Sequence, residues 1–279
     1  MTDLIAKREQ LLAEIGRYES CAVAFSAGVD STVVAKAAQI AIGDRAVAVT
    51  AVSPSLAEGE LEEACRLAEL IGIRHEIVRT EEMQNPDYVA NPSNRCYHCK
   101  TELYTQLEPL RERLKVSVIF NGANADDASD YRPGMKAAEE HRVVSPLLDC
   151  GIDKQLVRQL AADWELPVAD KPAAPCLASR IAYGEEVTAE RLQMIDRAEQ
   201  FLRSEGLSLL RVRYHRGDLA RLEVPPADIA RLADEELRRR ICNELQDLGF
   251  RYVTIDLVGF RSGSQNEVLP IEQLRLPNR

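Results

Sequence analysis

Cys-Ala-Val-Ala-Phe-Ser-Ala-Gly-Val-Asp-Ser, residues 21–31, is the stretch that decides the fold of this chain. Its first five residues form a short apolar run, which is typical of a buried parallel strand. The rest of the stretch is mostly small or polar and leads into a predicted helix over residues 32–42. Small residues let backbone N–H groups turn toward an anion, and a helix N-terminus adds partial positive charge. The stretch therefore predicts a strand, a phosphate-binding loop and a helix.

The side chains of this loop suit a nucleotide. Ser26 and Ser31 offer hydroxyl donors, and the carboxylate of Asp30 can hold the turn or a Mg²⁺ ion. The loop lacks the lysine of a Walker motif, so hydrolysis of a γ-phosphate is not the natural interpretation. The residues predicted to contact ATP are Ser26, Ala27, Gly28, Asp30, Ser31 and, after a later strand, Gly122. The alternative is a tight strand-to-helix turn without a ligand.

Strands and helices alternate after this loop. Further strands are predicted at 46–52, 74–78 and 116–120, and a helix at 97–114. Ser55 and Glu58 predict a capping box for another helix that ends near Ile71. This alternation indicates an α/β fold with a doubly wound parallel sheet and a ligand at the carboxyl ends of its strands.

The pattern changes in the C-terminal third of the chain. An irregular, proline-containing stretch up to Gly184 is followed by predicted helices at 188–205 and 234–248. Strands are predicted at 208–215, 218–224 and 252–258. We therefore expect a nucleotide-binding domain over residues 1–185 and a smaller α+β domain with antiparallel character over residues 186–279.

Composition excludes some classes of function. The 279 residues carry a net charge of −10, which argues against broad nucleic-acid binding. The N-terminus lacks the apolar core of a signal peptide, and no apolar run approaches the roughly 20 residues that cross a bilayer. We expect a cytoplasmic protein that binds neither nucleic acid nor membrane, with reduced thiols.

Three of the seven cysteines stand apart from the others. Cys96 and Cys99 form a C-x-x-C pair directly before a predicted helix, a spacing at which two thiolates bind one metal ion or one cluster. Cys176 lies close to Arg180, and a nearby cation favours the reactive thiolate. The remaining cysteines are expected to be core or incidental residues.

Two further segments carry charge that suits a phosphorylated ligand. Asp126, Asp127, Asp130 and Arg132 follow Gly122 and offer Mg²⁺ ligands or ion pairs; the alternative is a polar turn. Strand alternation places Arg211, Arg213 and His215 on one face, which predicts a phosphate site; the alternative is a solvated face.

These segments together resemble the LarE family of ATP-dependent sulfur transferases, within the PP-loop ATP pyrophosphatase superfamily. The resemblance rests on the Ser26–Ser31 loop, on residues 130–134 and the Cys176 segment, and on residues 211–213 and the tail at 249–263. Ala27 replaces the first glycine of the usual Ser-Gly-Gly-x-Asp-Ser loop, a mild change unless φ is positive there. The resemblance implies adenylation of the carboxylates of pyridinium-3,5-biscarboxylate mononucleotide and their conversion to thiocarboxylates, in the biosynthesis of the nickel-pincer nucleotide.

The resemblance also implies roles for individual residues. Catalysis falls to Cys176, Asp30 and Arg180, and Glu199 lies where the family binds a divalent metal, although a second ligand there is not clearly matched. The residues expected to bind the substrate or its phosphate are Lys100, Asp127, Asp130, Arg132, Ser179, Arg180, Arg211 and Arg213.

The cysteines depart from the family's single-cysteine pattern, in which the residue matching Cys176 surrenders its sulfur and becomes dehydroalanine. Cys96, Cys99 and Cys176 fit a three-cysteine branch in which a 4Fe–4S cluster delivers sulfide. Three alternatives stay open: a structural zinc with His98, a redox or persulfide relay, and Cys176 as a sacrificial donor.

Other functions are also open at this stage. They are a tRNA thiolase, an amide-forming PP-loop enzyme and a non-catalytic ATP-binding regulator. We expect ATP, Mg²⁺ and a 4Fe–4S cluster as cofactors, a small pyridinium nucleotide as substrate and a homo-oligomer, with a hexamer the most plausible. The source of sulfide is not indicated by the sequence.

Overall fold

The stretch that begins at Cys21 forms an inner strand of a parallel sheet in the computed structural model, which describes residues 2–129, 133–172, 174–261 and 263–270. The four strands lie in the order β3-β2-β1-β4. Their bounds are β1 Cys21–Ala24, β2 Ala46–Val52, β3 Arg74–Arg79 and β4 Val118–Phe120. In register, Cys21 pairs with Ala46 on one side and with Val118 on the other.

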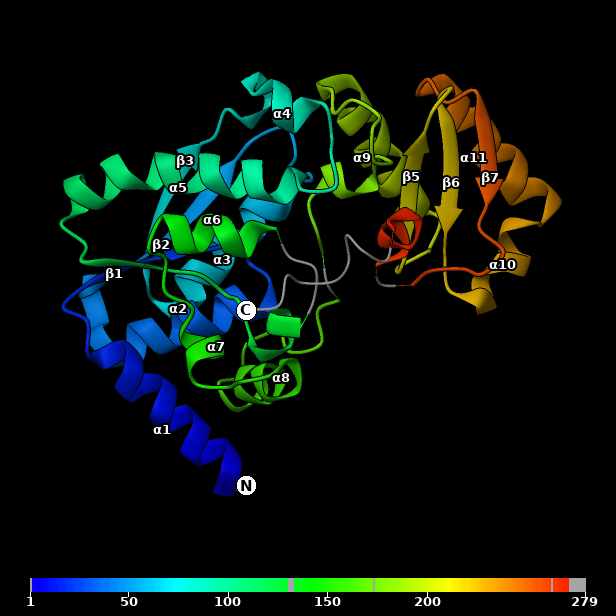
Figure 1. The fold of residues 1–279 in the computed structure, drawn as a ribbon. Helices are drawn as coiled ribbons and strands as arrows, with labels where there is room; N and C mark the ends of the chain where they lie inside the picture. Colours follow the sequence, from blue (N-terminus) through cyan, green and yellow to red (C-terminus); the bar gives the residue numbers. More distant parts are fainter. Residues whose placement is uncertain (1, 130–132, 173, 262, 271–279) are drawn as a thin grey trace.

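Helices cover both faces of this sheet (Figure 1). One face packs on α1 (Thr2–Gly16), α2 (Val29–Ile42), α3 (Glu60–Ile71) and α8 (Lys154–Asp163). The other packs on α5 (Arg95–Leu114) and α6 (Gly134–Glu140). Along β1, Cys21 and Val23 enter the first core and Ala22 the second, because successive strand residues point to opposite faces. The predicted doubly wound α/β fold is confirmed.

The chain reverses direction across the sheet between β1 and β4. The first three strands run outward from β1, and β4 then returns to its other side. The carboxyl ends of β1 and β4 therefore flank the point at which the strand order reverses, where open α/β sheets bind their ligands. Residues 25–31 and Gly122 lie at that edge.

One local expectation is wrong. Ser55 and Glu58 do not form a capping box: α3 begins at Glu60 after Gly59, whose φ is +83° and which has no side-chain cap. The Ser55 hydroxyl instead makes a 2.6 Å hydrogen bond with the Tyr88 hydroxyl. Ser55 is thus recruited by a tertiary contact with α4 (Pro86–Val89).

A second sheet follows in the C-terminal third of the chain. Its order is β5 (Arg211–His215), β6 (Leu219–Glu223) and β7 (Tyr252–Ile255), with an antiparallel first pair and a parallel second pair. The β6–β7 pair is parallel because α10 (Pro226–Leu232) and α11 (Glu235–Asp247) cross over between the two strands. The expected antiparallel character therefore holds for one pair.

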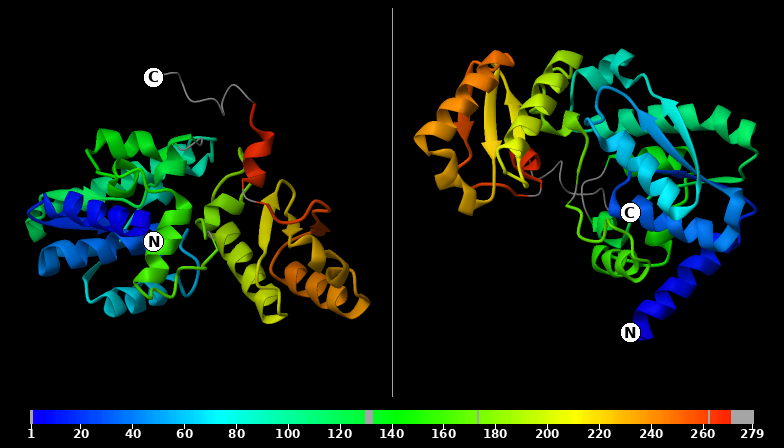
Figure 2. Two further views of the ribbon diagram at one scale, coloured as in Figure 1. Left: turned by 90° about the horizontal axis from the view of Figure 1, so that it is seen from below. Right: turned by 180° about the vertical axis from the view of Figure 1, so that it is seen from behind.

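The second sheet and its helices lie beside the first sheet (Figure 2). Their core includes Ile195 of α9 (Ala189–Ser204), Val212 and Leu245, and also Tyr88 and Leu177, which precede the predicted boundary. The division at residues 185 and 186 stays a prediction. Among the described residues, no helix is long and apolar enough to cross a membrane.

Candidate functional site

The loop between β1 and α2 is held by its own hydroxyl groups. The Ser31 hydroxyl accepts a hydrogen bond from the Ser26 backbone N–H (3.2 Å) and lies 3.1 Å from the Gly28 carbonyl oxygen. Thr32 donates to the same carbonyl at 2.8 Å. Gly28 is the N-cap of α2, and it makes no side-chain capping bond. The backbone N–H groups at the start of this 14-residue helix therefore have no side-chain cap to compete with an anion.

Ala27 adopts a left-handed backbone conformation. Its φ is +57°, and its methyl group is fully buried. The replacement of glycine by alanine therefore introduces backbone strain here, because the Cβ atom crowds the following carbonyl oxygen.

Gly122 is required by the loop itself. A Cβ atom at this position would lie 2.8 Å from the Ser31 backbone nitrogen and 3.1 Å from the Asp30 carbonyl carbon. The end of β4 thus packs closely against the start of α2 at Gly122. Contact between Gly122 and ATP stays a prediction.

Asp30 lies between two partners that fix its carboxylate. One oxygen accepts a hydrogen bond from the Asn124 side chain (3.0 Å), and the other forms an ion pair with Lys154 at the start of α8. A second lysine, Lys171, contacts the Ala27 carbonyl oxygen at 3.4 Å and forms a 3.2 Å ion pair with Glu60. Sequence reasoning missed both lysines. For Lys154 there was a signal, because it directly follows the N-cap Asp153 of a helix at the ligand edge of the sheet.

The acidic segment after Gly122 forms a 3-10 turn at Ala125–Ser129. Asp127 accepts a 3.0 Å hydrogen bond from the Asn124 N–H, and Asp126 accepts one from the Lys154 N–H at 3.0 Å. The Asp127 side chain thus closes the turn, and the Asp126 side chain ties the turn to the start of α8. The predicted residues Asp130 and Arg132 lie outside the described residues.

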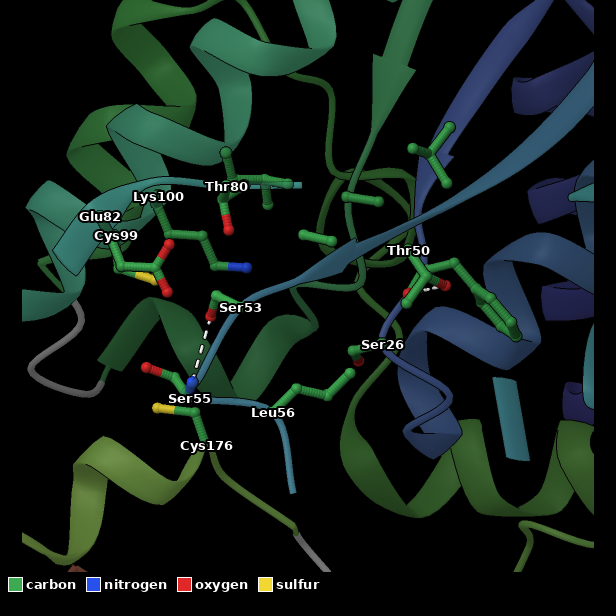
Figure 3. Close-up of a pocket in the computed structure, with 15 residues that line it drawn as sticks. Ser26, Thr50, Ser53, Ser55, Leu56, Thr80, Glu82, Cys99, Lys100 and Cys176 are labelled. Carbon is green, nitrogen blue, oxygen red and sulfur yellow. Dashed lines mark hydrogen bonds between the residues drawn. The ribbon is translucent and has the colours of Figure 1, made fainter. Parts of the chain in front are cut away.

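A cavity of about 150 Å³ opens beside Ser26 at the carboxyl ends of β1 and β2 (Figure 3). Its apolar walls include Leu56 and Leu103, and its polar groups come from β2, the end of β3 and α5. The lining residues with polar or thiol groups are Ser26, Thr50, Ser53, Ser55, Thr80, Glu82, Cys99, Lys100 and Cys176. The cavity thus extends from the phosphate loop to two of the three predicted cysteines.

Cys99, Lys100 and Cys176 line the same cavity. Burial acts to lower the pKa of Lys100, but the Tyr104 hydroxyl and the thiols of the three predicted cysteines outweigh it, and the pKa lies above its ordinary value. Burial raises the pKa of the Cys99 thiol to about 12, and the nearby Cys176 thiol adds to this rise. Cys96 and Cys176 are exposed, and Cys99 is half-buried. The described residues nevertheless contain no group of three or more His, Cys, Asp or Glu side chains arranged to hold a metal ion.

Arg180 braces the backbone of the Cys176 loop. Arg180 is 3% exposed, and its guanidinium donates to the carbonyl oxygens of Pro175 and Cys176 and to the Ser179 hydroxyl. The described contacts between Arg180 and Cys176 therefore run through the Cys176 carbonyl group. A catalytic role for Arg180 stays a prediction.

Glu199 is the buried partner of this arginine. Its carboxylate pairs with Arg180 at 3.0 Å and with Arg203 at 2.9 Å, and it accepts the Val212 N–H at 3.1 Å. Burial acts to raise the pKa of Glu199, but the Arg180 guanidinium, the Val212 N–H and the charge of Arg211 together outweigh it, and the pKa lies below its ordinary value. The carboxylate is thus occupied by protein groups here, and its predicted role as a divalent-metal ligand stays a prediction.

Arg211 and Arg213 are both buried on β5, so the alternative of a solvated strand face is wrong. Arg213 pairs with Glu223 at 2.8 Å and donates to the Ser179 carbonyl oxygen at 3.0 Å. Arg211 lies 5.1 Å from the centre of the Phe260 ring, and burial, with the charge of Arg180, lowers its pKa to about 10. The geometry connects β5 to the Cys176 loop, and the predicted binding roles of Ser179, Arg211 and Arg213 stay predictions.

The fold and the loop together define a class of protein. A phosphate loop without a Walker lysine, placed between the first strand and helix of a doubly wound parallel sheet, is typical of the ATP-using PP-loop enzymes. In agreement, the NAD synthase family matches residues 4–126.

Comparison with individual proteins narrows this class. The pyridinium-3,5-bisthiocarboxylic acid mononucleotide synthase of Lactiplantibacillus plantarum is 35% identical, over 98% of this chain and 99% of its own length. The chain therefore belongs to the family of that synthase, the LarE family. An uncharacterized Synechocystis protein is 48% identical over 95% of this chain and 99% of its own. An uncharacterized protein of Methanocaldococcus jannaschii is 27% identical over 92% and 97%, respectively.

Proposed function

We propose that this protein is an ATP-dependent sulfur transferase that converts carboxylates of pyridinium-3,5-biscarboxylate mononucleotide into thiocarboxylates. The observation that carries the proposal is the cavity that joins the phosphate loop at Ser26 to the thiols of Cys99 and Cys176. The named relative, a synthase of the bisthiocarboxylic product, supports the choice of substrate.

The first half-reaction is adenylation. An oxygen of the substrate carboxylate attacks the α-phosphorus of ATP, a new P–O bond forms, and the bond to pyrophosphate breaks. The loop N–H groups and the hydroxyls of Ser26 and Ser31 would bind the departing pyrophosphate, whose charge suits a helix N-terminus. Mg²⁺, held by acidic residues such as Asp30 or Asp127, would neutralise phosphate charge when bound.

The second half-reaction replaces AMP with sulfur. A sulfur nucleophile attacks the carbonyl carbon of the acyl-adenylate, and the bond between that carbon and the AMP oxygen breaks. The products are a thiocarboxylate and AMP. Lys100, whose ammonium group has no ion pair within the described residues, is suited to bind the substrate carboxylate.

Two groups in the site are candidates for the source of the sulfur: a bound cluster and the Cys176 thiol. Cys96, Cys99 and Cys176 fit a cluster by donor chemistry, since thiolates are its usual ligands, and two of the three thiols line one cavity. These three residues would hold a 4Fe–4S cluster, which supplies sulfide to the site when bound. In the alternative, the Cys176 Sγ atom displaces AMP as a thioester. Loss of the Cα proton then breaks the Cβ–Sγ bond and leaves dehydroalanine.

A reaction with anaerobically purified protein tests the proposal. The protein is incubated with ATP, Mg²⁺, sulfide and the pyridinium dicarboxylate ribotide, and pyrophosphate, AMP and thiocarboxylate are quantified. We expect all three to form in equal amounts and only with the ribotide present. Pyrophosphate release that needs tRNA, or AMP formation with ammonia and no sulfide, would instead indicate a tRNA thiolase or an amide-forming enzyme. A complete lack of pyrophosphate release would indicate a regulator.

The two sulfur sources are separated by Cys176→Ser and by intact-protein mass spectrometry. The control is Cys65→Ser, at an exposed thiol on α3. With a cluster, the wild-type protein binds iron and sulfide, performs several turnovers and keeps its mass. A single turnover with loss of hydrogen sulfide from Cys176, in protein free of iron, would contradict the cluster.

A further inference from the structure

Glu82 is a buried carboxylate without a protein partner. It is 2% exposed and lies on the 3-10 turn Glu82–Gln84 that follows β3. Its Oε2 atom is buried and makes no hydrogen bond, and no ion pair among the described residues includes Glu82. Protein interiors rarely hold such a group, since buried carboxylates are ordinarily paired or hydrogen-bonded.

The surroundings of Glu82 are those of the candidate active site. Figure 3 shows Glu82, Cys99 and Lys100 on the same side of the pocket, with the Cys176 thiol facing them. Lys100 and Glu82 are not paired with each other, although they line one cavity. The cavity thus offers one negative and one positive side chain, each available to a ligand.

We propose that Glu82 recognises the positive charge of the pyridinium ring while Lys100 binds a carboxylate on the same ring. The inference rests on the proposed function and adds a specificity-determining residue to it. A ring that carries a cationic nitrogen and flanking carboxylates has the two charges that this pair complements. A cationic ring also offsets the buried negative charge, whereas the neutral amino group of adenine supplies only a hydrogen bond.

The test is a binding measurement with Glu82→Gln, which keeps the shape of the side chain and removes its charge. Calorimetry compares two probes without ATP: the pyridinium-3,5-dicarboxylate ribotide and its neutral isostere, in which a benzene ring replaces the pyridinium. Binding of a non-hydrolysable ATP analogue is measured separately. The control is Glu81→Gln, at the exposed neighbouring carboxylate.

Wild-type protein is expected to bind the cationic ribotide about tenfold more tightly than the neutral isostere. Glu82→Gln should remove this preference and leave affinity for the ATP analogue unchanged, and Glu81→Gln should behave as wild type. The thermal midpoint of Glu82→Gln should equal or exceed that of wild type, because the variant removes an uncompensated buried charge. A carboxylate with a merely structural role would instead lose stability on substitution.

The outcomes separate the inference from the proposed function. If wild type and Glu82→Gln both convert the ribotide, and the ratio of their affinities for the cationic and the neutral probe is the same, the inference fails. The sulfur-transferase assignment then stands. If Glu82→Gln weakens only the ATP analogue, Glu82 faces adenine and the inference also fails. If wild-type protein neither binds nor converts the ribotide, both fail.

Discussion

At Ala27 the chain accepts a methyl group where the backbone favours glycine. Left-handed φ costs a non-glycine residue about 1–2 kcal/mol, yet the buried methyl group contributes about 0.8 kcal/mol of apolar burial. Ala27→Gly relieves the backbone strain but loses the apolar burial of the methyl group. We expect its free energy of unfolding to change by less than about 1 kcal/mol.

The matched control is Ala35→Gly, since Ala35 is equally buried but lies inside α2. It loses the methyl group and about 1 kcal/mol of helix propensity, so we expect a loss near 2 kcal/mol. Urea unfolding of both variants measures the difference. A loss in Ala27→Gly as large as that in Ala35→Gly would show that the left-handed conformation is not strained.

Gly122 sets the position of the phosphate loop. The methyl group of Gly122→Ala would lie 2.8 Å from the Ser31 backbone nitrogen, and neither backbone can rotate out of the way. We expect pyrophosphate release to fall on the order of 100-fold, because a loop displaced by about 1 Å no longer aligns the phosphates. Gly16→Ala, which has open space around it, should keep wild-type activity.

At the scale of elements, the Arg180–Glu199 pair fastens the Cys176 turn (Leu177–Arg180) to α9. Glu199→Gln leaves a guanidinium that is 3% exposed without its counter-charge, which costs about 3–5 kcal/mol. The control is Glu205→Gln, which removes a more exposed pair with Arg240 and should cost at most about 1 kcal/mol. Equal unfolding midpoints for the two variants would contradict the bracing role.

His75 on β3 is linked through Thr50 on β2 to Phe25, the residue that follows β1. Its Nε2 atom lies 2.8 Å from the Thr50 hydroxyl, which donates to the Phe25 carbonyl oxygen at 2.9 Å, next to the phosphate loop. Since the Thr50 proton is used, the neutral His75 ring donates from Nε2. Burial lowers the pKa of His75 below its ordinary 6.5, so the unfolded chain binds a proton more readily than the folded protein.

Folding stability should therefore be highest above about pH 6.5 and fall as the pH drops through the folded pKa. The glutamine of His75→Gln can still donate a hydrogen bond to Thr50 but has no titrating ring. Between about pH 7 and pH 5, this variant should therefore lose less stability than the wild-type protein. Unfolding midpoints at the two pH values measure this. His98→Gln, at a ring outside this hydrogen-bond chain, should lose as much as wild type.

At the scale of the molecule, local sequence patterns predicted many of the helices and strands but few of the partners that individual side chains contact. The predicted strand at 46–52 and the predicted helix at 97–114 agree with β2 and α5, because burial and helical periodicity act within a few residues. The helix at 226–232 was missed, and Ser55 was assigned to a cap although it bonds to Tyr88. Such contacts depend on segments far apart in the sequence.

The same distinction holds for the site. The strand and the helix on either side of the Ser26–Ser31 loop were predicted from local sequence, because a buried apolar run and helical periodicity act within a few residues. The binding of ATP by this loop stays a prediction. Lys171 and Glu82 were missed because a single charged residue carries no local pattern, and their surroundings come from segments far apart in the sequence. Lys154 was missed although it follows the N-cap residue Asp153. The arginines of β5 were predicted to share a face, but the sequence could not show that the second core and the Cys176 turn cover them.

The central claim is that the substrate carboxylate is adenylated before sulfur displaces AMP, and oxygen tracing tests it most directly. The ribotide is labelled with oxygen-18 in its carboxylates, converted in a single turnover, and AMP is analysed by mass spectrometry. We expect one labelled oxygen in the phosphate of AMP for each thiocarboxylate formed, because the P–O bond made in adenylation carries the carboxylate oxygen away. Unlabelled AMP, or label in inorganic phosphate with ADP as the other product, would contradict the account.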